Sequence, residues 1–140
     1  MNTLKRNLLW MGPLFVTVLL FFALFSGEKI SWESRYQNAL DRADREGKTV
    51  LMFVSSESCP WCTRMKRETL SDARVIEAIN EGFVPLFLEA PAGREEFAKS
   101  GLQVDGVPAT LLIDAQGREF GRIEGFLAPE AFLERLSLYR

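Results

Sequence analysis

The stretch that decides the fold is residues 49–62, which read Thr49-Val50-Leu51-Met52-Phe53-Val54-Ser55-Ser56-Glu57-Ser58-Cys59-Pro60-Trp61-Cys62. It begins with an apolar, β-branched run, which is typical of a strand that is buried on both faces. It ends in the only two cysteines of the chain, which are separated by two residues. The residues that follow, 63–70, favour a helix. The sequence therefore predicts a strand that passes directly into a helix, with the cysteine pair at the junction.

This junction predicts a reactive thiol at Cys59. The first backbone N–H groups of a helix have no intrahelical partner, and the positive end of the macrodipole lies there. Both features lower the pKa of a cysteine thiol below that of free cysteine. Cys62 lies one turn further along the helix, close enough to form a disulfide with Cys59. We therefore expect Cys59 to attack as the thiolate and Cys62 to resolve the mixed disulfide. Their redox-active disulfide is the only redox group that we expect, with no other cofactor.

Other interpretations of the cysteine pair call for different chemistry. A structural disulfide that closes so short a loop constrains the unfolded chain little. A zinc site needs about four ligands, whereas the chain has two cysteines and no histidine, so no metal site is expected. A metallochaperone could hold copper(I) between the two thiolates, and a non-catalytic adaptor would not use the cysteines at all. These last two functions stay open as alternatives to an enzyme.

A second informative segment lies at the N-terminus, where 21 uncharged residues separate Arg6 from Glu28. As a helix they would be about 31 Å long, which matches a bilayer core of about 30 Å. Lys5 and Arg6 precede the segment, and the positive-inside rule then keeps the N-terminus in the cytoplasm and exports the rest. A cleaved signal peptide is the alternative, although its apolar region is usually about 7 to 15 residues.

We therefore divide the chain into two parts. Residues 1–27 are expected to be a cytoplasmic stub and a transmembrane signal anchor, with residues 8–25 in the inner (cytoplasmic) membrane. Residues 28–140 are expected to form one domain in the periplasm, or otherwise outside the cytoplasm. This part holds all 19 acidic residues and 15 of the 17 basic residues, a mildly acidic balance that argues against a nucleic-acid partner. In an oxidising compartment the cysteine pair needs a redox partner to stay reduced.

The remaining pattern predicts an α/β domain. Apolar periodicity, Gly and Pro positions and candidate caps, among them Ser31 and Ser71, define the expected elements. These are a helix from Ser31 to Gly47, strand 49–55, helix 60–70, helix 71–82, strand 83–88, a loop at Pro91 and Gly93, helix 94–100, strands 110–114 and 118–124 joined by a turn, and a helix from Pro129. The tight turn makes the last two strands antiparallel. The order predicts a four-stranded mixed sheet flanked by helices, with the cysteines at the carboxyl end of a central strand.

At this point the chain resembles the thioredoxin superfamily. Two signatures carry the resemblance: the strand–Cys59-Pro60-Trp61-Cys62–helix junction, and Gly106-Val107-Pro108-Ala109-Thr110 before the third strand. The resemblance implies a thioredoxin fold in which the peptide bond before Pro108 is cis and faces the disulfide. It also implies that Val107 offers backbone groups to an extended substrate.

We expect Pro60, Trp61, Val107 and Pro108 to bind the client protein. Trp61 either lies on the rim beside Cys59 or packs back onto the domain as ordinary cover. The basic residues Arg64, Lys66 and Arg67 are expected to form a solvated helix face.

Within the superfamily, the chain is similar to membrane-anchored periplasmic proteins and to the C-terminal domain of the thiol:disulfide interchange protein. Three short stretches indicate this: Thr69-Leu70-Ser71-Asp72, Asp114-Ala115-Gln116-Gly117 and Gly125-Phe126. The likeness implies a monomeric thiol–disulfide oxidoreductase of cell redox homeostasis, which exchanges disulfides with protein substrates. It also implies a membrane-embedded electron donor as a separate partner. Because no histidine can stabilise the thiolate, we expect a reductase.

Two positions depart from the family pattern. Thioredoxins bury an acid six residues before the first cysteine, where this chain has Phe53. Glu57 lies nearer the motif, but we expect it to be a solvated loop residue. The dipeptide Pro60-Trp61 replaces the Gly-Pro of thioredoxins and is closer to the Pro-Tyr of glutaredoxins. Water is then expected to carry protons to and from the inner sulfur.

Overall fold

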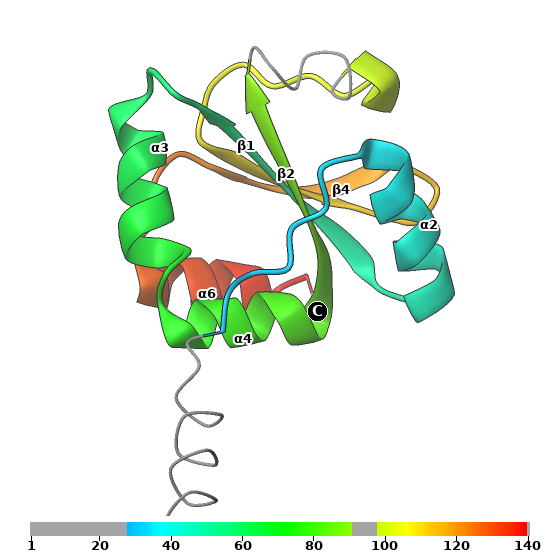
Figure 1. The fold of residues 1–140 in the computed structure, drawn as a ribbon, viewed down its shortest axis with the longest axis horizontal. Helices are drawn as coiled ribbons and strands as arrows, with labels where there is room; N and C mark the ends of the chain where they lie inside the picture. Colours follow the sequence, from blue (N-terminus) through cyan, green and yellow to red (C-terminus); the bar gives the residue numbers. More distant parts are fainter. Residues whose placement is uncertain (1–27, 91–97, 140) are drawn as a thin grey trace, which may run out of the picture.

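A four-stranded mixed sheet forms the centre of the domain (Figure 1). The computed structural model describes residues 28–90 and 98–139. The strand order is β2-β1-β3-β4, with bounds β1 (Thr49–Ser56), β2 (Phe83–Ala90), β3 (Ala109–Ile113) and β4 (Glu119–Glu124). β1 pairs parallel with β2 and antiparallel with β3, and β3 pairs antiparallel with β4. The predicted mixed sheet is therefore confirmed, and the cysteines follow the carboxyl end of its central strand β1.

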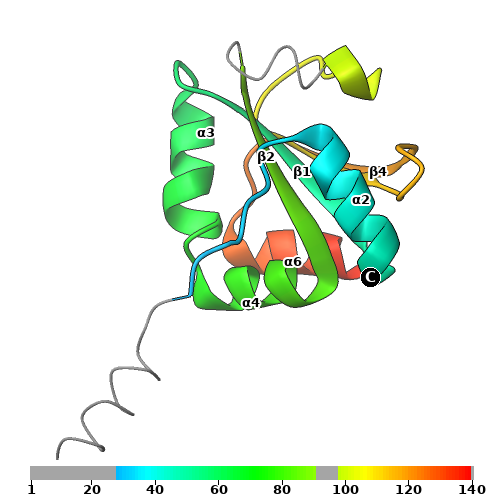
Figure 2. The same ribbon diagram turned by 45° about the vertical axis from the view of Figure 1, so that its right-hand side comes forward.

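Helices cover both faces of the sheet, as Figures 1 and 2 show. They are α2 (Tyr36–Glu46), α3 (Pro60–Arg64), the π-helical turn η1 (Met65–Thr69), α4 (Ala73–Gly82) and α6 (Pro129–Ser137). Successive side chains of β1 point to opposite faces of the sheet and so belong to two separate core clusters. Val50 and Met52 belong to the cluster that includes residues of α2, whereas Leu51 and Phe53 belong to the cluster with residues of η1, α4 and α6. All four side chains are fully buried, which explains why the run in the sequence is continuously apolar.

The predicted helix from Ser31 begins only at Tyr36, so the prediction is wrong for its first turn. Residues 31–35 are not helical, and Glu33 forms a bridge with β2. The Glu33 N–H donates to the Pro85 carbonyl at 2.8 Å, and its carbonyl accepts from the Phe87 N–H at 2.9 Å. β2 is an edge strand, and its outer backbone groups need partners. The hydrogen bonds that residues 31–35 supply to these groups stabilise the fold more than one further helical turn would.

The N-cap of α4 also differs from the prediction. Asp72, not Ser71, caps this helix, because its Oδ1 accepts the Arg74 N–H at 2.9 Å. The Ser71 hydroxyl instead donates to the Arg67 carbonyl in the middle of η1. Hydrogen bonds from the Arg74 side chain hold the pKa of Asp72 below its usual value. The carboxylate therefore stays charged at the helix N-terminus, where negative charge is favoured.

The remaining predicted ends agree with the structure to within about two residues. Gly47 ends α2 with a φ of 63°, and Pro129 opens α6. In the β3–β4 turn, Asp114 Oδ1 accepts the N–H groups of Gln116 and Arg118 at 3.0 and 2.9 Å. Gly117 takes the left-handed conformation with a φ of 82°. These contacts close the hairpin that makes β3 and β4 antiparallel.

Some predictions fall on residues outside the described ranges. The transmembrane segment within residues 1–27, the loop at Pro91 and Gly93, and the first part of the helix 94–100 are among them. The last turn of that helix, residues 98–100, is described and helical, and Gly101 follows with a φ of 68°. Within residues 28–90 and 98–139, no helix combines the length and apolar character that crossing a bilayer requires.

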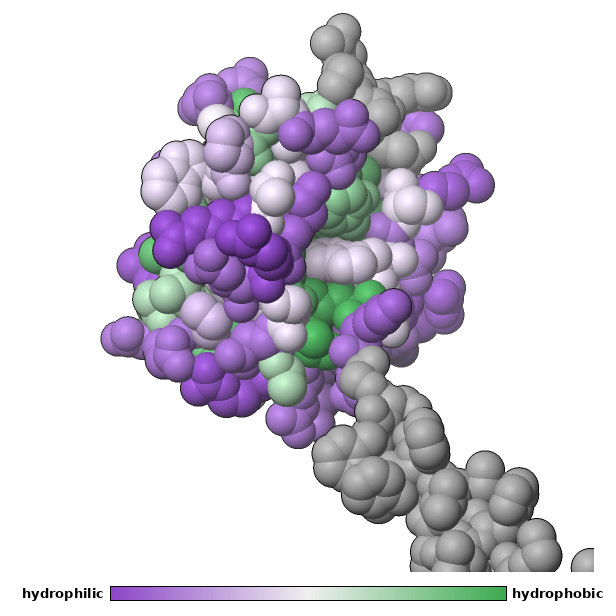
Figure 3. All heavy atoms as spheres, turned by 60° about the vertical axis from the view of Figure 1, so that its left-hand side comes forward, coloured by the Kyte–Doolittle hydropathy of each residue, from purple (hydrophilic) through white to green (hydrophobic). Residues whose placement is uncertain are grey.

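Phe53 is the centre of an aromatic cluster beneath the helix that carries the cysteines. Its ring centroid lies 6.2 Å from that of Trp32 and 5.9 Å from that of Phe87, and the side chain is fully buried. Figure 3 shows one face of the molecule, which is mostly hydrophilic, with apolar side chains gathered near its centre. The position where thioredoxins bury an acid therefore stabilises the core here.

Replacing this ring should destabilise the domain. We expect Phe53→Ala to lower the free energy of unfolding by about 3–5 kcal/mol, because it removes a large buried ring and leaves a cavity. Urea denaturation followed by circular dichroism measures the change. Phe120→Ala is the matched control, since Phe120 is 52% exposed and its loss should cost about 1 kcal/mol or less. Equal losses in the two variants would contradict the role given to Phe53.

Candidate redox site

The two cysteines lie at the N-terminus of α3, as predicted. Cys59 is the N-cap of this helix, Pro60 follows at its first position, and the two sulfurs form a disulfide. The backbone N–H of Cys62 points at Cys59 Sγ, with the nitrogen 3.1 Å from the sulfur. Cys59 is half-buried, whereas Cys62 is fully buried. The geometry thus makes Cys59 the sulfur that an incoming group can reach, and it directs a backbone donor at that sulfur.

A second loop faces the disulfide. The peptide bond between Val107 and Pro108 is cis, as the resemblance implied. The Val107 carbonyl oxygen lies 3.5 Å from Cys59 Sγ, and the Pro108 carbonyl accepts the Gly125 N–H at 2.8 Å. The loop is therefore tied to the segment after β4 and presents its backbone beside the reactive sulfur. An extended polypeptide can pair with such exposed backbone groups.

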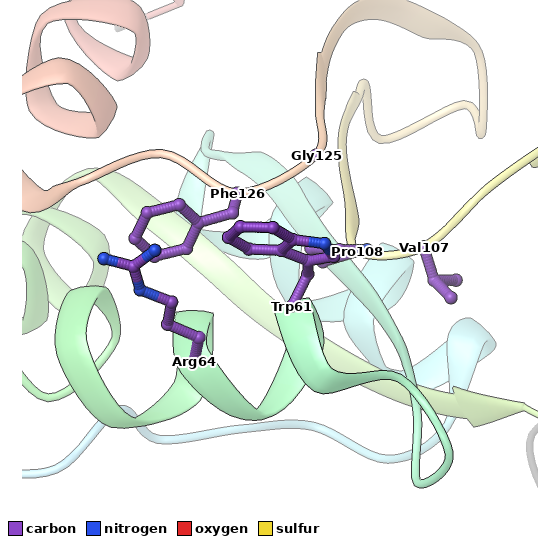
Figure 4. A pocket seen from close by; sticks show the side chains of 6 residues that line it. All are labelled: Trp61, Arg64, Val107, Pro108, Gly125 and Phe126. Atoms are coloured by element: carbon purple, nitrogen blue, oxygen red, sulfur yellow. The ribbon is translucent and has the colours of Figure 1, made fainter.

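Between these two segments lies a groove of about 450 Å³, lined by Trp61, Arg64, Val107, Pro108, Gly125 and Phe126 (Figure 4). Trp61 is 55% exposed, and its ring centroid is 5.9 Å from that of Phe126. The indole therefore lies on the rim beside Cys59 and also packs against the loop before α6. Both alternatives for this residue therefore hold in part, since the ring is exposed at the groove and also packs on Phe126.

Arg64 lies on the solvated helix face as expected, with 46% of its side chain exposed, but it also makes a contact that was not predicted from the sequence. Its guanidinium carbon lies 4.4 Å from the ring centroid of Phe126 and 5.6 Å from that of Trp61. It lines the groove and is not simply part of a solvated face. The spacing of three residues from Trp61 puts both side chains on one side of a helix, and this signal was present in the sequence. Phe126, which completes the stack, could be placed there only by the fold.

The other charged residues of this helix lie away from the groove. Arg67 is solvated, as expected, with 75% of its side chain exposed. Lys66 forms an ion pair with Glu89 at 3.6 Å, and Glu89 accepts a hydrogen bond from the buried Ser55 hydroxyl at 3.3 Å. Glu57 is exposed, in agreement with the prediction. The described residues contain no group of three or more histidine, cysteine or acidic side chains that could hold a metal ion.

Comparisons with known proteins agree with this geometry. The thioredoxin-like domain family matches residues 36–139. The thiol:disulfide interchange protein DsbD of Pseudoalteromonas atlantica is 26% identical over 100 residues, which are 69% of this chain and 17% of that protein. The chain therefore spans about a sixth of the length of this relative.

Two solved structures are also similar. A thioredoxin from Thermus thermophilus has a TM-score of 0.65 and 28% identity, covering 79% of this chain and 87% of that one. The oxidised C-terminal domain of DsbD from Neisseria meningitidis has a TM-score of 0.57 and 25% identity, covering 74% of this chain and 92% of that one. The chain belongs to the thioredoxin-like domain family, and it has the fold and the cysteine pair of a thiol–disulfide oxidoreductase.

Proposed function

We propose that this protein is an exported, membrane-tethered thiol–disulfide oxidoreductase that reduces disulfides in client proteins. The observation that carries the proposal is the pairing of an accessible Cys59, which receives the Cys62 N–H at 3.1 Å, with a fully buried Cys62 behind it. One sulfur can meet a client and the other can act only after the first has reacted. This division of labour is what stepwise disulfide exchange requires.

The reaction proceeds through two exchanges. In the reduced enzyme the Cys59 thiolate attacks one sulfur of a client disulfide, and the client S–S bond breaks as a Cys59–client disulfide forms. The first client sulfur leaves as a thiolate and takes up a proton. Cys62, once deprotonated, attacks Cys59 Sγ and releases the second client thiolate. Two electrons pass to the client, which gains two thiols, and the enzyme is left with the Cys59–Cys62 disulfide.

The surroundings of Cys59 favour the thiolate only moderately. The Cys62 N–H and the start of α3 stabilise a negative sulfur, whereas the Val107 carbonyl oxygen at 3.5 Å opposes it. The chain has no histidine to add a positive charge. A weakly stabilised thiolate gives a dithiol that yields its electrons readily, which supports the reductase direction. Because Phe53 occupies the position of the family's acid, water is the proposed proton carrier for Cys62.

Client binding uses few side chains in this proposal. Val107 offers its backbone beside Cys59, Trp61 and Pro108 line the adjoining groove, and the exposed Pro60 follows Cys59 in the chain. Strand-like backbone pairing reads little side-chain identity, which suits an enzyme with several clients. A monomer is sufficient for this chemistry, since both cysteines and the groove come from one chain.

The tether and the electron donor belong to the proposal as well. We assign residues 8–25 to the inner membrane, residues 28–140 to the periplasm, and regeneration of the dithiol to a membrane-embedded donor. Asn80 binds the chain where it enters the domain, through the Lys29 carbonyl at 3.0 Å and the Ser31 N–H at 3.2 Å. Asn80 precedes the amino end of β2, whereas Cys59 follows the carboxyl end of the parallel strand β1. The site thus faces away from the end where a tether would join (Figure 1).

The reactivity of Cys59 can be tested by alkylation of the reduced protein across a pH series. The rate should rise through a pKa below the value of about 8.5 for free cysteine, because the thiolate is the reacting form. Mass spectrometry should find the label on Cys59 and not on the buried Cys62. A profile that follows free cysteine, or a folded protein that does not react, would remove the basis of the enzymatic proposal.

Trapping of clients tests the two roles separately. Cys62→Ser should accumulate disulfide-linked client proteins on Cys59, because the resolving thiol is missing. The adducts are measured on non-reducing gels, and they should disappear on reduction. Cys59→Ser is the matched control and should trap none through the buried Cys62. If the exported Cys62→Ser protein carries no adduct, an exchange role with proteins is wrong.

Cell fractionation combined with thiol trapping tests direction and tether together. We expect the full chain in the inner-membrane fraction after alkaline washing, with Cys59 and Cys62 mostly reduced because a donor keeps them so. Mostly oxidised cysteines would contradict the reductase direction and indicate an oxidant. Release of the protein with the soluble periplasmic fraction would contradict the anchor and indicate a cleaved signal peptide.

A further inference from the structure

We propose that Arg64 at one end of the groove, with Asp105 and Glu124 at the other, selects client segments by charge. A preferred client carries an acidic residue on one side of the reacting cysteine and a basic residue on the other. This inference rests on the proposed exchange with polypeptide clients and names the chemistry that they present.

Arg64 is held in a geometry that suits a carboxylate. Its Nε donates to Glu68 at 3.0 Å, and within the described part of the chain its two terminal amino groups make no hydrogen bond. Its guanidinium carbon lies 4.4 Å from the ring centroid of Phe126, which holds the group at the groove (Figure 4). A planar pair of N–H donors matches a carboxylate in a two-point contact. The guanidinium of Arg64 therefore lies at the groove with its Nε bonded to Glu68 and its two terminal amino groups available to a client.

The end of the groove at Arg64 carries a positive net charge even when the neighbouring charged side chains are counted. Glu68 also lies 3.5 Å from Arg67, so one carboxylate is shared between two guanidinium groups. The three side chains together carry a net charge of +1. A client carboxylate is therefore attracted to this end of the groove. Because the site is partly open to solvent, the strength of this attraction depends on salt.

The opposite end of the groove is acidic. A second hollow, of about 280 Å³, is lined by Asp105, Gly106, Val107, Pro108, Glu124 and Gly125. It shares Val107, Pro108 and Gly125 with the first groove, so the two hollows adjoin along the cis-proline loop.

Among the described residues, Arg122 is a basic side chain beside Glu124 and is already engaged with Glu119. It contacts Glu119 through two hydrogen bonds of 2.6 and 2.7 Å, but approaches Glu124 only to 3.7 Å. Asp105 and Glu124 are both exposed. With Glu119 and Arg122 included, this end carries a net charge of −2.

The position of Cys59 fixes how a client meets both ends. Its sulfur lies 3.5 Å from the carbonyl oxygen of Val107, a residue that lines both hollows, so we infer that a client that delivers a cysteine there extends over each of them. In an extended segment, the residues two before and two after the cysteine point to the same side as the cysteine. Those two client side chains face the protein. One meets the basic end and the other meets the acidic end.

Two isomeric peptides test this polarity. Both have blocked ends and read Glu-Ala-Cys-Ala-Lys or Lys-Ala-Cys-Ala-Glu, so composition and net charge are identical. Each cysteine carries a thiopyridyl group in a mixed disulfide. Attack by Cys59 breaks that bond, forms the Cys59–peptide disulfide and releases thiopyridone, which is followed by absorbance. The assay uses the reduced full chain in a nonionic detergent.

We expect one isomer to react about two- to thirty-fold faster at low ionic strength, since two exposed charge pairs of this kind contribute about 0.2–1 kcal/mol each. The ratio should approach one in about 1 M salt, where the Debye length is about 3 Å. Equal rates at low salt would overturn the charge selection while leaving the proposed function intact. If neither isomer reacts faster than with a free thiol, the proposed function itself fails.

Variants assign the effect to its residues. Arg64→Met keeps an unbranched side chain over Phe126 but loses the charge, and it should halve the logarithm of the ratio between the two peptide rates. Arg64→Glu reverses the charge and should bring this ratio to one or invert it. Asp105→Lys tests the other end independently and should also lower the ratio, even if the Arg64 variants fold poorly. Arg45→Glu is the control, because it makes the same charge change on exposed surface of α2 and should leave the ratio unchanged. A ratio that survives both Arg64→Glu and Asp105→Lys would overturn the proposal.

Discussion

The contact between the Cys62 N–H and Cys59 Sγ is the interaction on which the chemistry of this protein depends. It exists because β1 ends at Ser56 and α3 begins at Pro60, which places Cys59 at the N-cap. The free N–H groups of the first helical turn then face a sulfur in place of a capping oxygen. The same turn buries Cys62 completely. A single strand-to-helix junction thus sets the reactivity of one thiol and the inaccessibility of the other.

The core below this junction is built differently from that of thioredoxins. Phe53 occupies the position of their buried acid and packs against Trp32 and Phe87. A charged group at such a site would require a partner, because burying an isolated charge is costly. The aromatic cluster removes that cost and strengthens the core. It also leaves this position without the acid that the family resemblance implies for proton transfer, so stability and the proposed proton transfer favour different residues here.

The groove beside the disulfide joins segments that are distant in the chain. Trp61 and Arg64 come from α3, Phe126 from the segment before α6, and Val107 from the loop before β3. In the proposed function, backbone groups supply the binding common to all clients, and the charges at the two ends supply a preference among them. Such a division allows a single site to accept many polypeptides and still rank them, since charge alters association more than it alters the chemical step.

Local patterns were enough to predict β1, α3, the β3–β4 hairpin and the placement of the cysteines between strand and helix. The family resemblance added the cis bond before Pro108, which no local pattern contains. Only the tertiary structure decided that residues 31–35 pair with the edge of β2 and that Arg64 stacks on Phe126. Both depend on groups more than fifty positions away in the chain, whereas periodicity and capping report only on near neighbours. The sequence by itself determined which sulfur caps the helix and which lies inside it, because both positions follow from a local strand-to-helix junction, whereas the packing of distant segments determined what surrounds them.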